Sequence, residues 1–485
     1  MIQTSIKGGL DLKPGSRVYF IGIGGISMSG LAEISHNLGF IIGGSDRHFN
    51  GRTKVLQTHG AILHQGHDAN NLAAFQPDLV VYTAAVHEDN SELGYARLHG
   101  LTTIDRATFL GWLNQLFERV INIAGTHGKT TTTALCSMIM MESGLDPTVH
   151  LGAELKQFHG TVRLGDDNKL LVSEACEYMK GLLKYHSTTA AILNIDFDHV
   201  DSFANIEEVI ETFLEFADHL SEDDYLVIPA FDSNIRKMLT ELRARRTGRG
   251  DAMPKIWSFG LEGDDFEGDK PTVYATNLVY EQGMPRFDVY LQGELYAHIE
   301  LQIPGQHNAT NALAAIACAH INGGTPEAAA KALAAFSGAE GRFTHAGTYK
   351  QAMVISDYAH HPAAARATLA AAANIPHEHI WVVFQPLTFS RTQVLFDDYV
   401  DALKDCELVI FSEIYSDRDI GKVSSRDLAA RINELGGNAV FAEDFAEIKT
   451  WLDKISGPGD IILVLGPEDI RGFADQLTGR TDIFA

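Results

Sequence analysis

The segment with the clearest chemical potential is the run GTHGKTT at residues 125–131, which follows an apolar stretch and precedes a helical pattern. A strand that turns into a helix through such a loop points several backbone N–H groups at one place, where a phosphate can bind. We expect Lys129 to supply positive charge to the β- and γ-phosphates of a nucleotide and the Thr130 hydroxyl to coordinate Mg²⁺. The full Walker pattern has a glycine where Ile123 stands, and a strand-to-helix turn without a ligand is the alternative.

Acidic residues follow two further apolar runs. SEACE, with Glu174, comes after residues 170–172, and NIDFDHVD, with His199, comes after residues 190–193. The carboxyl ends of parallel strands lie on the ligand-binding side of an α/β sheet, where carboxylate oxygens suit Mg²⁺. Beside a phosphate loop, these residues indicate a magnesium site, although a histidine near aspartates on a surface is the more ordinary explanation for His199 alone.

A glycine-rich loop also opens the chain, as GIGGIS at residues 22–27 after a strand pattern. It directs backbone amides at a pyrophosphate, and Asp46 lies about twenty residues further on, where a ribose-binding acid stands in dinucleotide sites. Ser27 occupies the third glycine position. An NAD dehydrogenase is therefore one alternative here, and a purely structural turn is another.

Three later segments carry polar residues at expected strand or helix ends. Asn308 and Asn311 stand at helical spacing, able to offer amides to a purine, or to serve only as helix-capping residues. DYAHHP at residues 357–362 and FQPLTFSRT at residues 384–392 each follow a strand pattern. Both loops should therefore lie at the binding edge of a last sheet.

The elements that position these motifs predict an α/β fold throughout. Short β-branched runs alternate with longer helical stretches, as in parallel sheets covered by helices. Boundaries near residues 115 and 343 divide the chain into three domains. Residues 248–271 have the composition of a loop, and residues 273–303 alternate as antiparallel strands do.

Composition narrows the function classes. The 38 basic and 63 acidic residues give a net charge of −25, which argues against a general binder of nucleic acid or anionic membranes. The four cysteines form no CxxC pair, which argues against a thiolate zinc site and a disulfide framework. With no signal-peptide pattern at residues 1–13 and no membrane-length apolar run, we expect a cytoplasmic protein. The oligomeric state, monomer or dimer, stays open.

The order of the motifs resembles the Mur ligases of peptidoglycan synthesis over essentially the whole chain. The resemblance rests on GIGGISMSGLAE, AGTHGKTTTTAL, SEACE, NIDFDHVDSF, IPGQHNATNALAA, GRF, DYAHHP, FQPLTFSRT and EIYSDRD. It implies a Rossmann-like domain for a UDP-sugar at residues 1–115, a central P-loop ATPase domain at 116–342, and a Rossmann-like domain for an amino acid at 343–485.

The implied reaction begins when ATP phosphorylates the carboxylate of UDP-N-acetylmuramate, and the amino group of a small amino acid, L-alanine first, then displaces phosphate. The resemblance assigns catalytic roles to Lys129, Glu174, His199 and Arg391, and Mg²⁺ to Thr130, Glu174 and His199. ATP-binding roles fall on Gly125, Thr126, Gly128, Lys129, Thr130, Thr131, Asn308, Asn311, Arg342 and Asp357. Contacts with the other substrates fall on Gly22, Gly24, Gly25, Ser27, Asp46, His127, Tyr358, His360 and Arg391.

The chain departs from the family pattern where the amino acid should bind. The family's usual loop reads FQPHRYTR or FQPHTYTR, whereas Leu387 and Phe389 replace its histidine and tyrosine here, and Arg391 remains as a carboxylate clamp. Glycine, L-serine or another nucleotide-linked acceptor is therefore an alternative to L-alanine with UDP-N-acetylmuramate. A nucleotide-binding relative without turnover is a further hypothesis, which intact Lys129 and Glu174 disfavour.

Overall fold

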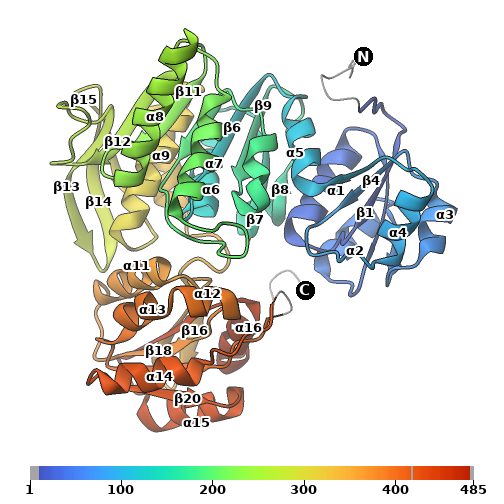
Figure 1. Cartoon of the computed structure of the whole chain (residues 1–485). Coiled ribbons are helices and arrows are strands. Elements are labelled where there is room, and N and C mark those ends of the chain that lie inside the picture. The colour runs from blue at the N-terminus through green and yellow to red at the C-terminus, as the bar shows by residue number, and fades with distance from the viewer. Residues whose placement is uncertain (1–9, 417–418, 481–485) are drawn as a thin grey trace.

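The computed structural model describes residues 10–416 and 419–480. Its strands form three sheets that follow one another along the chain, and Figure 1 shows them in three separate bodies. Residues 1–9 of the expected N-terminus, and Asp417 and Arg418 of the EIYSDRD motif, lie outside the described residues.

The first sheet is parallel throughout and has the strand order β3-β2-β1-β4-β5. This order is that of a dinucleotide-binding half-fold, whose ligands bind beyond the carboxyl ends of the strands. Its strands are β1 (Arg17–Ile21), β2 (Ile41–Asp46), β3 (Ile62–Gln65), β4 (Leu79–Tyr82) and β5 (Thr103–Asp105). Its helices are α1 (Ile26–Asn37), α2 (Gly51–Thr58), α3 (Ala69–Phe75), α4 (Ser91–Leu98) and α5 (Arg106–Asn114).

The central sheet has ten strands in the order β15-β14-β13-β12-β11-β10-β6-β9-β7-β8. Strands β7 to β13 of this order are parallel, while β8, β14 and β15 pair antiparallel at the two edges. The strands are β6 (Arg119–Ala124), β7 (Thr148–Leu155), β8 (Gly160–Arg163), β9 (Leu170–Ala175), β10 (Thr189–Ile192), β11 (Tyr225–Pro229), β12 (Lys255–Leu261), β13 (Val273–Glu281), β14 (Met284–Leu291) and β15 (Glu294–Glu300). The α-helices are α6 (Lys129–Glu142), α7 (Ile206–Asp218), α8 (Ser233–Arg249), α9 (Gln306–Ile321) and α10 (Pro326–Ala335), with 3₁₀ turns η1 (Lys156–Phe158) and η2 (Tyr178–Lys184).

The antiparallel strands expected at residues 273–303 are confirmed by β13, β14 and β15. The loop expected at residues 248–271 is wrong in its middle, because β12 pairs in parallel with β11 there. Phe259 in β12 is fully buried. The strand lies beside charged, glycine-rich residues, so the composition of the window concealed it.

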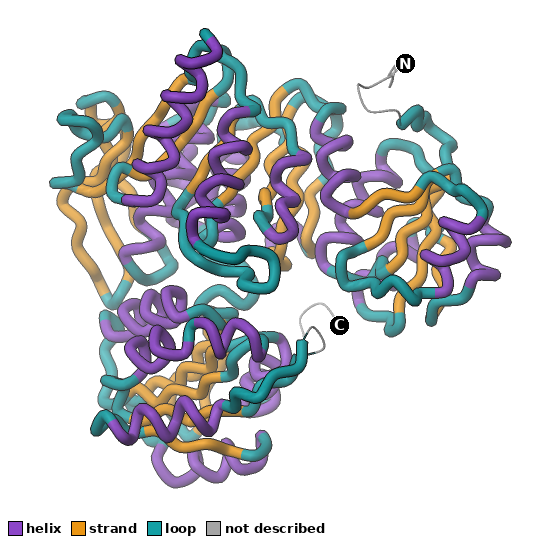
Figure 2. The backbone as a smooth tube through the Cα atoms, in the orientation of Figure 1, coloured by secondary structure: helices purple, strands orange, loops and turns teal. Residues whose placement is uncertain are grey.

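The third sheet has the order β16-β17-β21-β18-β19-β20, and every pair except β16–β17 is parallel. Figure 2 shows its strands between layers of helices. The strands are β16 (Thr344–Tyr349), β17 (Ala352–Asp357), β18 (Ile380–Phe384), β19 (Leu408–Ser412), β20 (Ala439–Ala442) and β21 (Ile461–Leu465). The helices are α11 (Pro362–Ala373), α12 (Phe389–Val394), α13 (Phe396–Leu403), α14 (Ser425–Glu434), α15 (Phe445–Ile455) and α16 (Glu468–Thr478).

The hydrophobic cores show how the bodies are joined. One apolar cluster runs from the first sheet, through Phe109 and Trp112 of α5, into the face of the central sheet beneath α7 and α8. The third sheet has separate clusters on its two faces. The first two bodies therefore share a core, whereas the third has its own, against which Phe197 of the central body packs.

Two general findings concern the described residues. None of their helices is both long and apolar enough to cross a bilayer. The four cysteines, Cys136, Cys176, Cys318 and Cys406, form no disulfide.

Candidate active site

Three of the sequence motifs converge because their strands are neighbours in the central sheet. Strand β6 lies between β9 and β10, with Ala124 in register with Ala175 on one side and Ile192 on the other. The phosphate loop after β6 therefore lies between the SEACE segment, whose first three residues end β9, and the NIDFDHVD segment, which follows β10. The parallel arrangement places all three at one carboxyl edge.

The phosphate loop depends on two glycines. Gly125 has φ +132° and Gly128, which caps α6, has φ +86°. Such angles are costly for any residue with a Cβ atom. A Cβ atom on Gly128 would also lie 2.6 Å from Oδ1 of Asn311. The loop can therefore approach the start of α9 closely.

Lys129 is engaged by its own loop and by a carboxylate. Its Nζ donates to the Gly125 carbonyl at 2.5 Å and the Thr126 carbonyl at 3.0 Å, and lies 3.0 Å from Oε2 of Glu177. Burial opposes protonation, but Glu177 outweighs it and the pKa of Lys129 is raised. The ammonium charge is therefore secured beside the phosphate loop.

The predicted magnesium ligands fall into two groups. The Thr130 hydroxyl donates to Oε2 of Glu174 at 3.1 Å, and Oε1 of Glu174 accepts from the Gly152 N–H at 2.5 Å. Burial raises the pKa of Glu174. His199 Nε2 lies 3.7 Å from Oε1 of Glu177, and burial lowers the pKa of His199, which favours the neutral, metal-binding imidazole.

The residues that sequence reasoning missed are Glu177 and Asp198. Glu177 is buried, pairs with Lys129 and approaches His199. Asp198 lies 2.5 Å from Nη2 of Arg391 in α12, so it joins the central body to the third. Burial opposes ionisation of Asp198, but Arg391 and nearby imidazoles outweigh it and hold the pKa well below its usual range. Both residues belong to motifs quoted above, but their spacing in the sequence does not indicate which side chains they contact.

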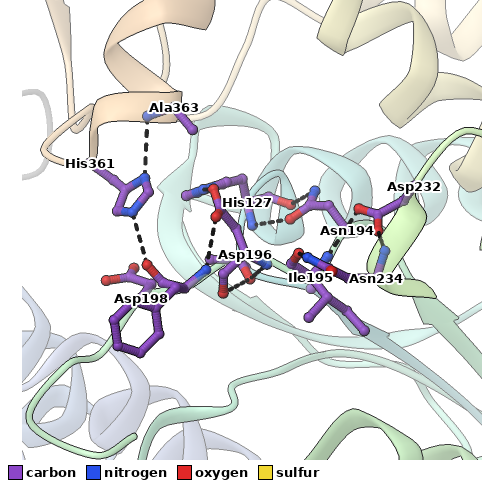
Figure 3. A network of polar contacts seen from close by, with 12 residues as sticks. His127, Asn194, Ile195, Asp196, Asp198, Asp232, Asn234, His361 and Ala363 are labelled. Carbon is purple, nitrogen blue, oxygen red and sulfur yellow. Dashed lines mark hydrogen bonds and ion pairs between the residues drawn. The ribbon is translucent and has the colours of Figure 1, made fainter. Parts of the chain in front are cut away.

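A second contact between these two bodies involves the histidines (Figure 3). His361 caps α11, where its Nδ1 accepts from the Ala363 N–H, and its Nε2 lies 3.2 Å from the Phe197 carbonyl. The centre of the His127 ring lies 4.8 Å from that of His361, with the two planes tilted by 43°, and its Nε2 lies 3.4 Å from Oδ2 of Asp196. Burial, then His127, lowers the pKa of His361 to about 4.

A cavity of ≈570 Å³ lies between the central and third bodies, and most of the predicted site residues line it. Those that do are Thr126, His127, Gly128, Lys129, Thr130, Thr131, Glu174, His199, Asn308, Asn311, Arg342, Asp357, Tyr358, His360 and Arg391. Leu387 also lines it, and Gly125 is the only phosphate-loop residue of the prediction outside its lining.

The two asparagines are held by one another and by the backbone. Asn311 Nδ2 donates to Oδ1 of Asn308 at 3.1 Å, and Asn308 Nδ2 donates to the Pro304 carbonyl at 2.7 Å. Arg342 and Tyr358 also line the cavity, and the Arg342 guanidinium lies 5.1 Å from the centre of the Tyr358 ring. Burial raises the pKa of Asp357, which accepts from the Phe343 N–H. The same cavity is therefore lined by asparagine amides, a guanidinium and a carboxyl group.

The predicted first-domain residues, Gly22, Gly24, Gly25, Ser27 and Asp46, lie outside this cavity. Oδ2 of Asp46 accepts from the Gly24 N–H at 2.8 Å, so the carboxylate holds the glycine loop itself. Ser27 Oγ accepts from Arg106 at 3.0 Å and lies 3.2 Å from Nε2 of His150 in β7. The glycine loop therefore faces the central body.

Three family models match successive parts of the chain. The Mur ligase family catalytic domain matches residues 17–118, the Mur ligase middle domain matches 123–319, and the Mur ligase glutamate ligase domain matches 341–467.

Similar proteins cover nearly the full length. The UDP-N-acetylmuramate–L-alanine ligase of Acetivibrio thermocellus is 41% identical over 474 residues, which are 97% of this chain and 96% of that protein. The enzyme of the same name from Clostridium novyi is 39% identical, over 94% and 95% of the two chains. The crystal structure of UDP-N-acetylmuramate–alanine ligase MurC from Thermotoga maritima has a TM-score of 0.76 and 27% identity, covering 96% of this chain and 98% of that one. On this evidence the chain belongs to the Mur ligase family.

Proposed function

We propose that this protein is an ATP-dependent ligase that joins L-alanine to the carboxylate of UDP-N-acetylmuramate through an acyl phosphate. The observation that carries the proposal is that Lys129 of the phosphate loop and Arg391 of the third body line the same cavity. The relatives with this printed activity, at about 40% identity over almost the whole chain, support it.

Each end of the cavity suits one half of the reaction. At the central end, Lys129 and the amides at the start of α6 stabilise the charge that moves between phosphate oxygens. Asn308 and Asn311 would bind the adenine, with Arg342 and Asp357 closing on ATP from the other side. At the other end, Arg391, with His127, Tyr358 and His360 nearby, would hold the amino acid for attack on the activated carboxyl carbon.

The donor set fits Mg²⁺. Thr130 and Glu174 offer adjacent oxygens, which this hard cation prefers. His199 and Glu177 are a second pair beside them, whereas burial raises the pKa of Cys176 and keeps it a thiol, a poor ligand. When bound, Mg²⁺ would neutralise the phosphate charge that otherwise repels the attacking carboxylate.

The three bodies would divide the substrates. Residues 1–115 would bind the UDP-sugar through Gly22, Gly24, Gly25, Ser27 and Asp46, residues 116–342 would bind ATP, and residues 343–485 would bind the amino acid. A cytoplasmic location stays a prediction from the cysteine pattern.

A second candidate differs only in the amino acid. Leu387 lines the cavity where the family has histidine, so glycine or L-serine could replace L-alanine. The test measures phosphate release from ATP and Mg²⁺ with UDP-N-acetylmuramate and each amino acid, omitting each component in turn. Release that requires both UDP-N-acetylmuramate and L-alanine supports the proposal. Release with glycine or L-serine alone would establish the second candidate, and no release would refute both.

A further inference from the structure

Arg52 joins the first body to the central body beside the glycine loop. It is the second residue of α2, and its Nε donates to the Gly24 carbonyl at 3.1 Å. Its Nη1 lies 2.7 Å from Oε1 of Glu154 in β7, and the two side chains are 27% and 14% exposed. One guanidinium therefore holds both the glycine loop and the central sheet, in an ion pair that is largely shielded from water.

Glu154 also contacts the connection to the third body. Its backbone carbonyl accepts from the Glu340 N–H at 3.0 Å. Glu340 lies between α10 and β16, and its carboxylate accepts from Nη1 and Nη2 of Arg480 at 3.0 and 2.7 Å. Arg471 of α16 lies 3.7 Å from the same carboxylate. Glu154 therefore contacts the first body through its side chain and the connection to the third body through its backbone.

The contacts continue from Glu340 to the wall of the cavity. The next residue, Gly341, has φ +72°, and a Cβ atom on it would lie 2.5 Å from Cζ of Arg471. The Gly341 carbonyl accepts from the Tyr358 N–H at 3.0 Å. Tyr358 and Arg342 both line the cavity. A displacement of Glu340 would therefore move residues that line the cavity.

We propose that Arg52 and Glu154 are positioning residues that couple the UDP-sugar site of the first body to the cavity between the central and third bodies. The inference rests on the proposed function, which assigns the UDP-sugar to the glycine loop. A pyrophosphate on that loop would fix the Gly24 carbonyl and Arg52 in the geometry that keeps Glu154 against Glu340. The UDP-sugar should therefore strengthen the binding of ligands in the cavity, and by linkage those ligands strengthen UDP-sugar binding by the same factor.

The experiment measures the Kd of UDP-N-acetylmuramate by calorimetry with the full-length protein. One titration uses the protein alone, and the other adds saturating Mg²⁺, L-alanine and an ATP analogue that cannot be hydrolysed. The ratio of the two constants is the coupling factor, which should be about fivefold or more for the unchanged protein. In Arg52→Met and in Glu154→Met it should fall to within about twofold of one, while the Kd of the ATP analogue alone stays within about twofold.

The coupling factor distinguishes this role from a structural one. A variant that only loosens the UDP-sugar site weakens binding in both titrations equally and leaves the ratio unchanged. Because Arg52 and Glu154 act through one contact, the double variant should lose no more coupling than either single variant.

Arg163→Met is the matched control. Arg163 pairs with Asp146 and donates to the Pro147 carbonyl, so it also joins a carboxylate to a backbone carbonyl, but within the central body. Its coupling factor should stay within about twofold of that of the unchanged protein.

Three results would overturn the inference. The first is a coupling factor that persists in the folded variants, since the ligands would then communicate without this ion pair. The second is an unchanged protein whose coupling factor is close to one, and the third is an equal loss in Arg163→Met. Because the two single variants remove opposite sides of the pair, misfolding of one leaves the other to decide. If UDP-N-acetylmuramate did not bind the unchanged protein at all, the proposed function itself would fail.

Discussion

Lys129 is held before any nucleotide is present, by Glu177 and by two carbonyls of its own loop. An incoming phosphate therefore finds the ammonium group already placed, and it competes with a carboxylate for it. The same contact makes Lys129 hard to replace cleanly, since its removal strands a buried Glu177.

Lys129→Ala should lower kcat by about 100-fold or more, because the variant lacks the charge that stabilises the transferred phosphoryl group. Phosphate release measures the rate, and calorimetry should show that UDP-N-acetylmuramate binding is spared. The stranded Glu177 costs roughly 3–5 kcal/mol, so Lys129→Met with Glu177→Gln is the better-folded comparison. A near-normal rate in either protein would contradict the placement of ATP.

Leu387→His restores the family's residue at the wall of the cavity. We expect the apparent affinity for the amino acid to change several-fold, while the KM for ATP stays within about twofold, because Leu387 lies in the loop that leads to Arg391. Steady-state kinetics with each substrate varied in turn measures both. Equal changes in the two constants would argue against this loop as an amino-acid site.

For single residues, the sequence predicted which residues belong to the site better than it predicted which side chains they contact. Lys129, Thr130 and Glu174 were identifiable because they follow strands in a recognisable order. Glu177 and Asp198 were not, because their roles arise from Lys129 and from Arg391, a residue of another domain almost two hundred positions away in the sequence. A contact between residues that lie far apart in the sequence produces no recurring pattern from which it could be predicted.

Among the elements, the turn from β6 into α6 is the one most constrained by backbone conformation. Gly128→Ala would force a Cβ atom into a left-handed residue and against Asn311. Gly144, after α6, has φ +76° but no atom within 4 Å of a Cβ, so Gly144→Ala isolates the backbone cost.

Gly144→Ala should lower the free energy of unfolding by about 1 kcal/mol, and Gly128→Ala by about 1–3 kcal/mol more. Only Gly128→Ala should also weaken ATP binding, because the loop must shift away from α9. Urea unfolding and nucleotide titration measure the two effects. Equal stabilities for the two variants would show that the contact with Asn311 is relieved without cost.

The sequence predicted a strand correctly where an apolar run stood apart from charged and glycine-rich residues, and it missed one where the run lay among them. The segments before DYAHHP and FQPLTFSRT, which the sequence predicts to be strands, are β17 and β18. Strand β12 was hidden among charged residues, and its burial comes from β11 and from α9, which contacts it. Tertiary packing, rather than local pattern, makes that segment a strand.

For the whole molecule, the joint between the first and central bodies contains a buried histidine. His150 in β7 contacts the Ser27 side chain and carbonyl, and burial lowers the pKa of His150 to about 4. In the unfolded chain the pKa is about 6.5. The folded protein thus keeps His150 neutral, and its stability is full above pH 6.5 and falls as the pH drops toward 4.

His150→Gln keeps a side-chain donor but does not titrate. Between pH 7 and pH 5, the free energy of unfolding of the unchanged protein should fall by about 2 kcal/mol more than that of the variant. Urea unfolding at the two pH values measures it, and acid titration of other groups cancels in the comparison. Parallel pH dependence in the two proteins would mean that folding does not change the pKa of His150.

Each sheet is built entirely from its own stretch of the chain: β1–β5, then β6–β15, then β16–β21. No strand must therefore wait for a partner from a later body while the polypeptide is being made. Domains of such chains fold as units during synthesis, N-terminal first. The first sheet can pair its strands while the phosphate loop is still inside the ribosome, whereas the contact of Ser27 with His150 must await β7. The amino-acid end of the cavity is the last part to be assembled.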